Sequence, residues 1–382
     1  MIKKSLYLDY AATTPVDPRV ADAMHACLTS DGNYGNPASR AHVYGWQAEE
    51  AVEVARRQVA DLIGADPREI VWTSGATESD NLAIKGAVQA SGDKGRHIVT
   101  TQIEHKAVLD TCAYLQTQNV DVTYVAPDNN GYINRDSILR VVRDDTILVS
   151  VMQVNNETGV INDIVGIGQA CRERGILFHC DAAQSVGKLD VNVQQLHVDL
   201  LSISAHKMYG PKGVGALYVR RHPDVNIMAQ IHGGGHERGM RSGSLPTHQV
   251  AGFGVAADIA KAQLSEDFAH LTALRAHFLA GLSDIDGIRI HEDIPHQFPG
   301  IVNVEFVDID GETMLLSLRE LAVSSGSACT SASVDPSYVL KAMGLSNISA
   351  HNSLRFSFGR TTGIDDVTFA VKTIQAACAT LV

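Results

Sequence analysis

The sequence predicts an α/β protein with a large, doubly wound and mainly parallel sheet, followed by a smaller α+β domain. Short apolar runs alternate with helical periodicity up to about residue 260. Several of these runs are apolar at every position, as strands buried on both faces of a parallel sheet are. The alternation of apolar runs and helical segments then ends. In addition, a chain of 382 residues is too long for one compact core.

Two amphipathic helices are expected before the first strand. The first covers residues 17–28: Asp17 supplies the cap, Pro18 takes the first helical position, and the apolar face runs to Leu28. The second helix closes at Gly64. Its apolar side chains recur at helical spacing, at Ala48, Val52, Ala55, Val59 and Leu62.

Five strand-like runs follow, and each ends in polar residues. They are EIVWTSG (69–75), HIVTTQIEH (97–105), TILVSVMQVNN (146–156), GILFHCDAAQ (175–184) and VDLLSISAHK (198–207). Helical segments such as SDNLAIKGAV lie between them, and this βαβα order predicts an open sheet that binds its ligand beyond the carboxyl ends of the strands. The polar side chains expected there are Thr77, His105, Asn156, Asp181, Gln184, Ser204, His206 and Lys207.

The last third of the chain predicts the smaller domain. A polar amphipathic helix (SEDFAHLTALRAHFLAGL) leads to the runs NVEF, LAVSSGSACTSAS and SLRFSFGR, and a final helix starts at Asp365. We therefore expect a large domain over residues 16–262. Residues 1–15 are expected to cross back and join residues 263–382 in the small domain.

Composition argues against several classes of protein. There are 31 Lys and Arg against 43 Asp and Glu, a net charge of −12, which opposes a general binder of nucleic acid or anionic membranes. The N-terminal MIKKSLYLDYAATTP has no apolar core of a signal peptide, and no apolar run approaches the ~20 residues of a membrane span. We expect a cytoplasmic protein.

A metal site is not expected. The six cysteines contain neither a C-x-x-C pair nor zinc-type spacing. His232 and His236 are four residues apart, but the three glycines between them disfavour a helix by roughly 1 kcal/mol each.

Lys207 and Asp181 follow apolar strands and suggest an aldehyde cofactor. A lysine desolvated at a strand end has a lowered pKa and can form a Schiff base, and Ser204 and His206 offer a phosphate ligand and a further polar contact. Otherwise Lys207 is a surface lysine. Asp181 can keep a pyridine nitrogen protonated, or it caps the next helix; the residues alone leave both open.

The segment TSGATESDNLAI (73–84) reads as strand, turn and helix. Gly75, Ala76 and Thr77 present backbone N–H groups and a hydroxyl at the positive end of a helix, which suits a phosphate. Thr77 and Glu78 are equally suited to ordinary helix capping.

Many motifs of this chain, in this order, resemble the cysteine desulfurases that serve iron–sulfur cluster assembly, within the class-V aminotransferases. The resemblance covers almost the whole chain and implies a fold-type-I (aspartate-aminotransferase-like) enzyme with pyridoxal 5'-phosphate (PLP). The motifs are YLDYAATTP, GNPASRAH, TSGATESDN, EHKAVLD, VNNETG, DAAQSVGK, SAHKMYGPKGVGALYVR, GGGHERGMRSGS and SSGSACTSAS.

The resemblance also implies roles in cofactor binding. Lys207 would form the Schiff base, His105 would stack on the ring, and Asp181 would pair with its nitrogen. Asn156 and Gln184 would contact the ring oxygen. The phosphate would be held by Ala76, Thr77, Ser204 and His206 and by Ser244 of a neighbouring subunit, so a homodimer would share its sites. Many relatives have threonine at position 244, and serine keeps the hydroxyl.

The implied substrate is L-cysteine. Arg355, beside Asn156, would grip its carboxylate, a planar two-point contact that suits arginine. Cys329 would take the sulfur as a persulfide, and His105 would move protons on the substrate thiol. Cys329 lies among small residues without a large apolar anchor, so we expect a mobile segment. The other five cysteines are interpreted as small buried hydrophobes.

The sulfur acceptor stays open. Relatives usually continue with a polar tail that helps to dock an iron–sulfur scaffold protein, whereas this chain ends at Val382. Cys329 could ligate iron transiently with such a scaffold; a tRNA-thiolation protein or a nucleic-acid sulfur-modification system are the other acceptors. An aminotransferase, a selenocysteine lyase and a catalytically idle scaffold are the competing functions. An aminotransferase has no need of Cys329.

Overall fold

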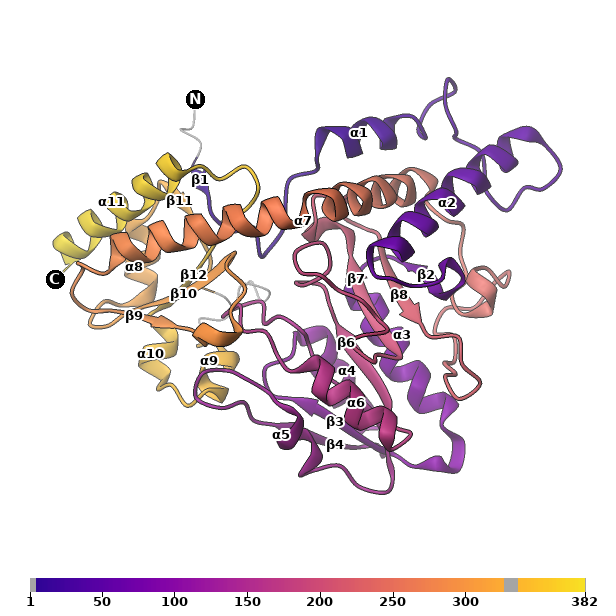
Figure 1. Cartoon of the computed structure of the whole chain (residues 1–382), viewed down its shortest axis with the longest axis horizontal. Coiled ribbons are helices and arrows are strands. Elements are labelled where there is room, and N and C mark those ends of the chain that lie inside the picture. The colour runs from indigo at the N-terminus through magenta and orange to yellow at the C-terminus, as the bar shows by residue number, and fades with distance from the viewer. Residues whose placement is uncertain (1–4, 326–335, 382) are drawn as a thin grey trace.

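The computed structural model describes residues 5–325 and 336–381, which form a large and a small lobe joined by one long helix (Figure 1). The large lobe contains a seven-stranded sheet in the order β2-β8-β7-β6-β5-β3-β4. Only β8 runs antiparallel to its neighbours, so the predicted mainly parallel sheet is confirmed. The strands are β2 (Ile70–Thr73), β3 (His97–Thr101), β4 (Asp121–Val125), β5 (Thr146–Ser150), β6 (Leu177–Asp181), β7 (Leu200–Ser204) and β8 (Gly215–Val219).

Helices cover both faces of this sheet, as a doubly wound fold requires. One apolar core lies beneath α3 (Ala76–Ala90) and α4 (Lys106–Gln116). The core on the opposite face is built with α2 (Val43–Leu62), α5 (Arg135–Leu139), α6 (Ile164–Glu173) and the first half of α7 (Thr247–Leu282). The short helix α1 (Pro18–His25) packs on α7.

The small lobe is an α+β unit around a separate core. Its antiparallel sheet has the order β12-β10-β9, and β1 pairs in parallel with β11. The strands are β1 (Leu6–Tyr7), β9 (Ile288–His291), β10 (Ile301–Phe306), β11 (Leu321–Ala322) and β12 (Ser353–Ser357). The helices are α8 (Gly311–Ser317), α9 (Tyr338–Ala342), α10 (Asn347–His351) and α11 (Ile364–Leu381).

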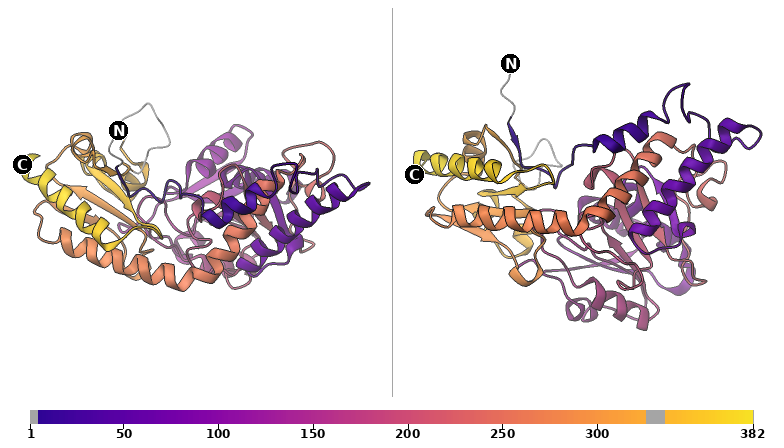
Figure 2. Two further views of the ribbon diagram at one scale, coloured as in Figure 1. Left: turned by 90° about the horizontal axis from the view of Figure 1, so that it is seen from above. Right: turned by 45° about the horizontal axis from the view of Figure 1, so that its top comes forward.

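Helix α7 links the two lobes as one continuous helix, which bends between them (Figure 2). Val250 to Ala260 contribute to the core of the large lobe, and Leu271 to Leu282 contribute to that of the small lobe. None of residues 261–270 between them is buried. We propose that the domain boundary lies in this stretch of the helix, which contains the division expected between residues 262 and 263.

Three local expectations differ from the structure. The first helix ends at His25, so Leu28 is exposed instead of completing an apolar face. Strands β4 and β8 were not predicted: β4 is partly exposed at the sheet edge, and β8 follows a glycine-rich turn rather than a helix. The helix predicted in the small domain starts earlier, at Thr247. Within the described residues, none of the helices combines the length and apolar character that crossing a bilayer requires.

Short 3-10 turns complete the fold: η1 (Pro67–Glu69), η2 (Gly92–Lys94), η3 (Ala205–Lys207), η4 (Glu237–Gly239) and η5 (Ile294–His296). The η4 turn fixes the glycine-rich segment through Glu237. Its carboxylate accepts from Arg56 Nη1 and Nη2 at 2.7 and 2.9 Å and from the Trp72 backbone N–H at 2.9 Å. Arg56 and Glu237 are both buried, so each charge depends on the other.

We predict that Glu237→Ala lowers the stability of the chain by about 3 kcal/mol, because the Arg56 guanidinium loses its buried partner and keeps only the more exposed Glu53 carboxylate at 2.9 Å. The midpoint of urea unfolding measures the change. Glu266→Ala, which removes an exposed carboxylate from α7, should stay within about 0.5 kcal/mol of the wild type. Equal midpoints for the two variants would contradict the role of the pair.

Candidate active site

A cavity of about 480 Å³ lies beyond the carboxyl ends of the central strands. Most of the residues predicted for the site line it together: Ala76, Thr77, His105, Asn156, Asp181, Gln184, Ser204, His206, Lys207 and Arg355. Ser244 is exposed and is not among the lining residues. Cys329 lies outside the described residues. Sequence analysis missed the contributions of Ala11, Ala12, Ser74 and Lys212 to the wall.

The cavity meets the N-terminus of α3. Gly75 precedes this helix with φ of 153°, and a Cβ there would meet open space. No side chain caps this helix at Gly75; Glu78 in its first turn accepts from the Ser74 N–H at 2.8 Å and pairs with Arg241 at 2.7 Å. The open backbone at the positive end of a 15-residue helix is suited to a phosphate.

Lys207 is held by the N-terminal segment. It ends the η3 turn directly after β7, and its ammonium donates to the carbonyls of Ala11 and Ala12 at 2.6 and 2.8 Å. Thr14 fixes the same segment, since its hydroxyl donates to the His206 carbonyl at 3.0 Å. No sequence pattern predicts these carbonyl contacts, because they depend on how the N-terminal segment crosses between the lobes.

Asp181 ends β6 and is almost fully buried at the cavity wall. Its Oδ1 accepts from the Ala183 N–H at 2.9 Å, so it caps a turn and not a helix. Burial raises the pKa of this carboxyl, while His105 and Lys207 act in the opposite direction. A buried carboxylate of this kind needs a cationic partner, such as a protonated pyridine nitrogen.

His105 caps α4 through its ring. Nδ1 accepts from the Ala107 N–H at 3.1 Å. The neutral ring therefore has its proton on Nε2.

Arg355 comes from β12 of the small lobe and already has an anionic neighbour. Its Nη2 donates to Asp9 Oδ1 at 2.8 Å, and its Nη1 donates to the Asn156 carbonyl at 2.8 Å. The Nε of Arg355 and the side-chain Oδ1 of Asn156 are buried without a hydrogen-bond partner among the described residues. A guanidinium has five donors, so donors remain for a substrate carboxylate.

Comparison with known proteins identifies the family. The chain matches the family described as aminotransferase class-V over residues 6–369. It belongs to the class-V aminotransferases. The cysteine desulfurase IscS of Vibrio vulnificus (strain YJ016) is 57% identical over 380 residues, which cover 100% of this chain and 94% of that protein.

Two solved structures of class-V relatives share the fold over their whole length. One described as a NifS-like protein aligns with a TM-score of 0.91 and 37% identity, and covers 99% of this chain and 100% of its own. SspA in complex with cysteine aligns with a TM-score of 0.83 and 38% identity, over 93% of this chain and 99% of its own. The cofactor of this class-V enzyme is PLP.

The cavity fits PLP group by group. Lys207 supplies an amine for the aldehyde group of PLP, and the open N-terminus of α3 suits its phosphate. The buried carboxylate of Asp181 suits its ring nitrogen. Asn156 Oδ1 still lacks a donor. The residues that would hold the cofactor are Ala76, Thr77, His105, Asp181, Gln184, Ser204, His206 and Lys207.

The remaining cysteines are inert. Cys27, Cys112, Cys171, Cys180 and Cys378 are all buried, as expected. Burial raises the pKa of Cys112 and Cys171 to about 12, so both stay protonated thiols at neutral pH.

We predict that Lys207→Ala protein loses the visible absorbance of bound PLP and all production of alanine from L-cysteine, because no other amine takes the place of Nζ at the two carbonyls. Spectroscopy of the purified protein and an alanine assay measure both. Lys372→Ala, an exposed lysine on α11, is the matched control and should keep both. Normal turnover by Lys207→Ala protein would overturn the assignment.

Proposed function

We propose that this class-V enzyme is a cysteine desulfurase, which converts L-cysteine to L-alanine and carries the sulfur as a persulfide on Cys329. The main support is the convergence of Lys207, Asp181 and Arg355 in one cavity, from three separate parts of the chain. The names of its relatives, cysteine desulfurase IscS and SspA in complex with cysteine, point to the same substrate.

Substrate binding rests on Arg355 and Asn156. The guanidinium offers its free N–H groups to the carboxylate of L-cysteine, and Asp9 and the Asn156 carbonyl hold it in position. Because Arg355 is almost fully buried, the carboxylate is bound away from bulk water, where its attraction to the guanidinium is strong.

Three residues move or stabilise protons. PLP, when bound, withdraws electrons from the α-carbon of the substrate. Asp181 keeps the ring nitrogen protonated, which strengthens this withdrawal. Lys207 removes the α-proton once the substrate has displaced its amine, and His105 exchanges protons with the substrate thiol at Nε2.

The sulfur step belongs to Cys329. Its thiolate attacks the sulfur of the substrate, so that an S–S bond forms and the bond between sulfur and the substrate β-carbon breaks. The electron pair of the broken bond stays with the carbon skeleton, which is protonated and leaves as alanine. The persulfide then passes to an acceptor protein for iron–sulfur cluster assembly, tRNA thiolation or another sulfur modification.

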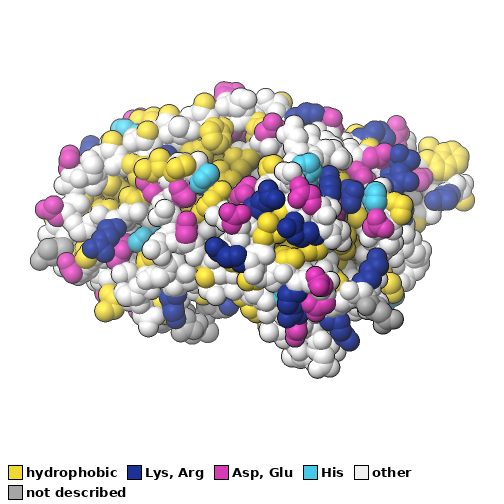
Figure 3. All heavy atoms as spheres, turned by 60° about the horizontal axis from the view of Figure 1, so that its bottom comes forward, with side chains coloured by type: hydrophobic (Ala, Val, Ile, Leu, Met, Phe, Trp, Pro, Cys, Tyr) yellow, Lys and Arg dark blue, Asp and Glu magenta, His cyan; other side chains and the backbone are white. Residues whose placement is uncertain are grey.

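A homodimer would complete each site. Ser244 is exposed in its own subunit. A residue that reaches the phosphate site of a neighbouring subunit must be exposed in this way. Large apolar side chains gather near the start of α2, at the right-hand end of Figure 3, and an exposed set of this size favours a second copy of the chain. The set is Leu28, Tyr34, Val43, Tyr44 and Trp46.

The expected location is the cytoplasm. A persulfide-forming thiol needs a reducing compartment, and the five described cysteines are all free. Charges of both signs are interspersed on the face shown in Figure 3, which does not favour a polyanion.

We predict that Cys329→Ser protein binds PLP and changes its visible spectrum with L-cysteine but forms no persulfide and no alanine. The cofactor contacts lie on other residues, whereas a hydroxyl is a poor nucleophile toward sulfur and forms no stable persulfide. Alanine and protein persulfide are measured in one sample, with Cys378→Ser as the control. Wild-type rates of both products in Cys329→Ser protein would contradict the role of Cys329.

A second prediction concerns the dimer. Light scattering should give twice the mass of the chain, and Trp46→Asp should shift the protein toward monomer and lower its affinity for PLP, because Ser244 of the neighbour is lost. Ile348→Asp, an exposed apolar residue on α10, should leave the mass unchanged. A fully active wild-type monomer would refute shared sites.

A further inference from the structure

Lys188 lies directly behind the cavity, one turn beyond Gln184. Residues 182–189 form successive turns, in which the N–H groups of Val186 and Leu189 donate to the carbonyls of Ala182 and Ser185. This winding places the side chains of residues four apart on one side. The Lys188 ammonium accordingly donates to Gln184 Oε1 at 2.7 Å.

This contact leaves one orientation for the Gln184 amide. An ammonium can only donate, so the atom that faces Lys188 is the oxygen. A backbone carbonyl can only accept, and the Gln184 nitrogen donates to the Ala11 carbonyl at 2.8 Å. Ala11 takes one of the two hydrogens on Nε2, so the second N–H of the amide is left for a group in the cavity that Gln184 lines.

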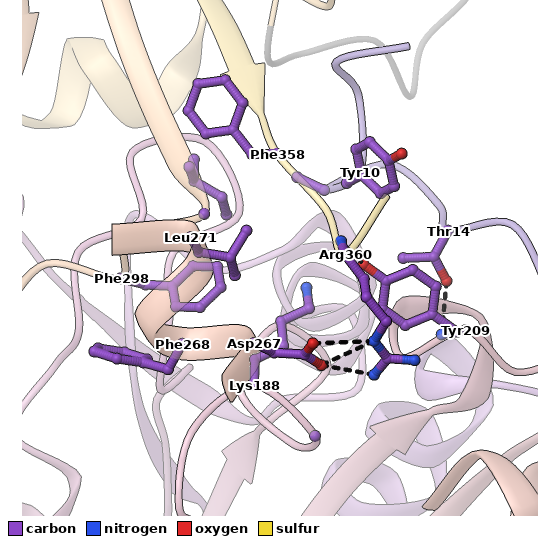
Figure 4. Close-up of a pocket in the computed structure, with 14 residues that line it drawn as sticks. Tyr10, Thr14, Lys188, Tyr209, Asp267, Phe268, Leu271, Phe298, Phe358 and Arg360 are labelled. Carbon is purple, nitrogen blue, oxygen red and sulfur yellow. Dashed lines mark hydrogen bonds and ion pairs between the residues drawn. The ribbon is translucent and has the colours of Figure 1, made fainter. Parts of the chain in front are cut away.

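The carboxylate that lines the small cavity beside Lys188 is bound to another residue. Figure 4 shows Lys188 entering a small cavity of about 30 Å³ between the lobes, beside Phe298 and Tyr209. Asp267 in that cavity is bound to Arg360 at 2.6 Å. Among the described residues, the hydrogen bond of the Lys188 ammonium is the one to Gln184.

The surroundings of Lys188 are electrostatically positive. Burial, together with the charges of Lys207 and Arg355, lowers the pKa of Lys188 to about 7. A cation in such a place is stabilised when an anion binds nearby. Polarisation by the ammonium also makes the Gln184 N–H a stronger donor.

We propose that Lys188 is a positioning residue for PLP, an inference that rests on the proposed function. Through the Gln184 amide, Lys188 would direct a polarised N–H and positive charge at the anionic ring oxygen. Gln184 makes the contact, and Lys188 acts through it. The charged and titratable groups that line the two cavities on either side are Tyr10, Glu78, His105, Asp181, His206, Lys207, Tyr209, Lys212, Arg355 and the Asp267–Arg360 pair, and Asp9 is bound to Arg355.

The test uses full-length apoenzyme with Lys188→Met, which keeps the length of the side chain and removes the charge. We expect the Kd for PLP to rise about three- to tenfold, because one charge-assisted hydrogen bond that acts indirectly, through Gln184, is lost. We also expect the pH midpoint of the visible spectrum of the bound cofactor to rise, because a nearby positive charge disfavours protonation and its removal favours it.

A double-variant cycle separates this role from a structural one. In the Gln184→Leu background, the amide through which Lys188 acts is already absent. Lys188→Met should then change the Kd for PLP by less than about twofold and should shift the spectral midpoint by less than about 0.3 pH units. A full further loss in that background would show that Lys188 acts by packing. Lys188→Gln serves as the second neutral variant if the methionine variant fails to fold.

Lys261→Met is the matched control, because it removes an exposed ammonium paired with Asp61 on the surface of α7. It should match the wild type in both measurements. If the wild-type protein showed no absorbance of bound PLP, the proposed function itself would be contradicted. Wild-type absorbance with an unchanged Kd and an unchanged midpoint in Lys188→Met protein would overturn only the inference about Lys188.

Discussion

The site depends on one crossing of the chain between the two lobes. Residues 6–7 pair with β11 in the small lobe, and Asp9 binds Arg355. A few residues later Ala11 and Ala12 hold the Lys207 ammonium in the large lobe with their backbone carbonyls. A short stretch of chain, which turns at residues 10–12, therefore positions both the candidate cofactor lysine and the candidate carboxylate ligand. Since the stretch binds both lobes, the distance between the two groups is fixed by its backbone and not by the orientation of α7 alone.

The charge distribution of the cavity follows from that crossing. Lys207 and Arg355 line the cavity, and Lys188 lies behind it with a pKa lowered to about 7. Asp9 is paired with Arg355, whereas Asp181 faces the cavity from the end of β6 and interacts with the buried carboxyls of Asp80 and Glu104. An anionic cofactor with one cationic ring nitrogen would complement this pattern, with its phosphate and ring oxygen toward donors and its nitrogen toward Asp181.

Sequence reasoning could find the strand ends but not the contacts across lobes. Lys207 and Asp181 follow continuous apolar runs and His105 follows the strand-like run HIVTTQIEH, and in a parallel sheet such ends meet at one edge whatever the loops do. The pairing of Asp9 with Arg355 involves residues 346 positions apart, and no local pattern encodes it. Strand β8 was missed because its apolar run follows a turn instead of a helix. The end of the first helix was misjudged, because Leu28 fits the helical period although the chain has already turned at Ala26.

The cavity has an amine, carboxylates and an imidazole, but the described cysteines cannot serve as its nucleophile. All five are buried, and where burial raises their pKa the thiolate is disfavoured at neutral pH. The described residues that bracket Cys329 are nevertheless bound at this wall. Ser324 exchanges backbone hydrogen bonds with Arg355, and the Ser337 hydroxyl donates to Glu157, the neighbour of Asn156, at 2.5 Å. The described residues on either side of positions 326–335 thus lie beside the two residues proposed to bind L-cysteine.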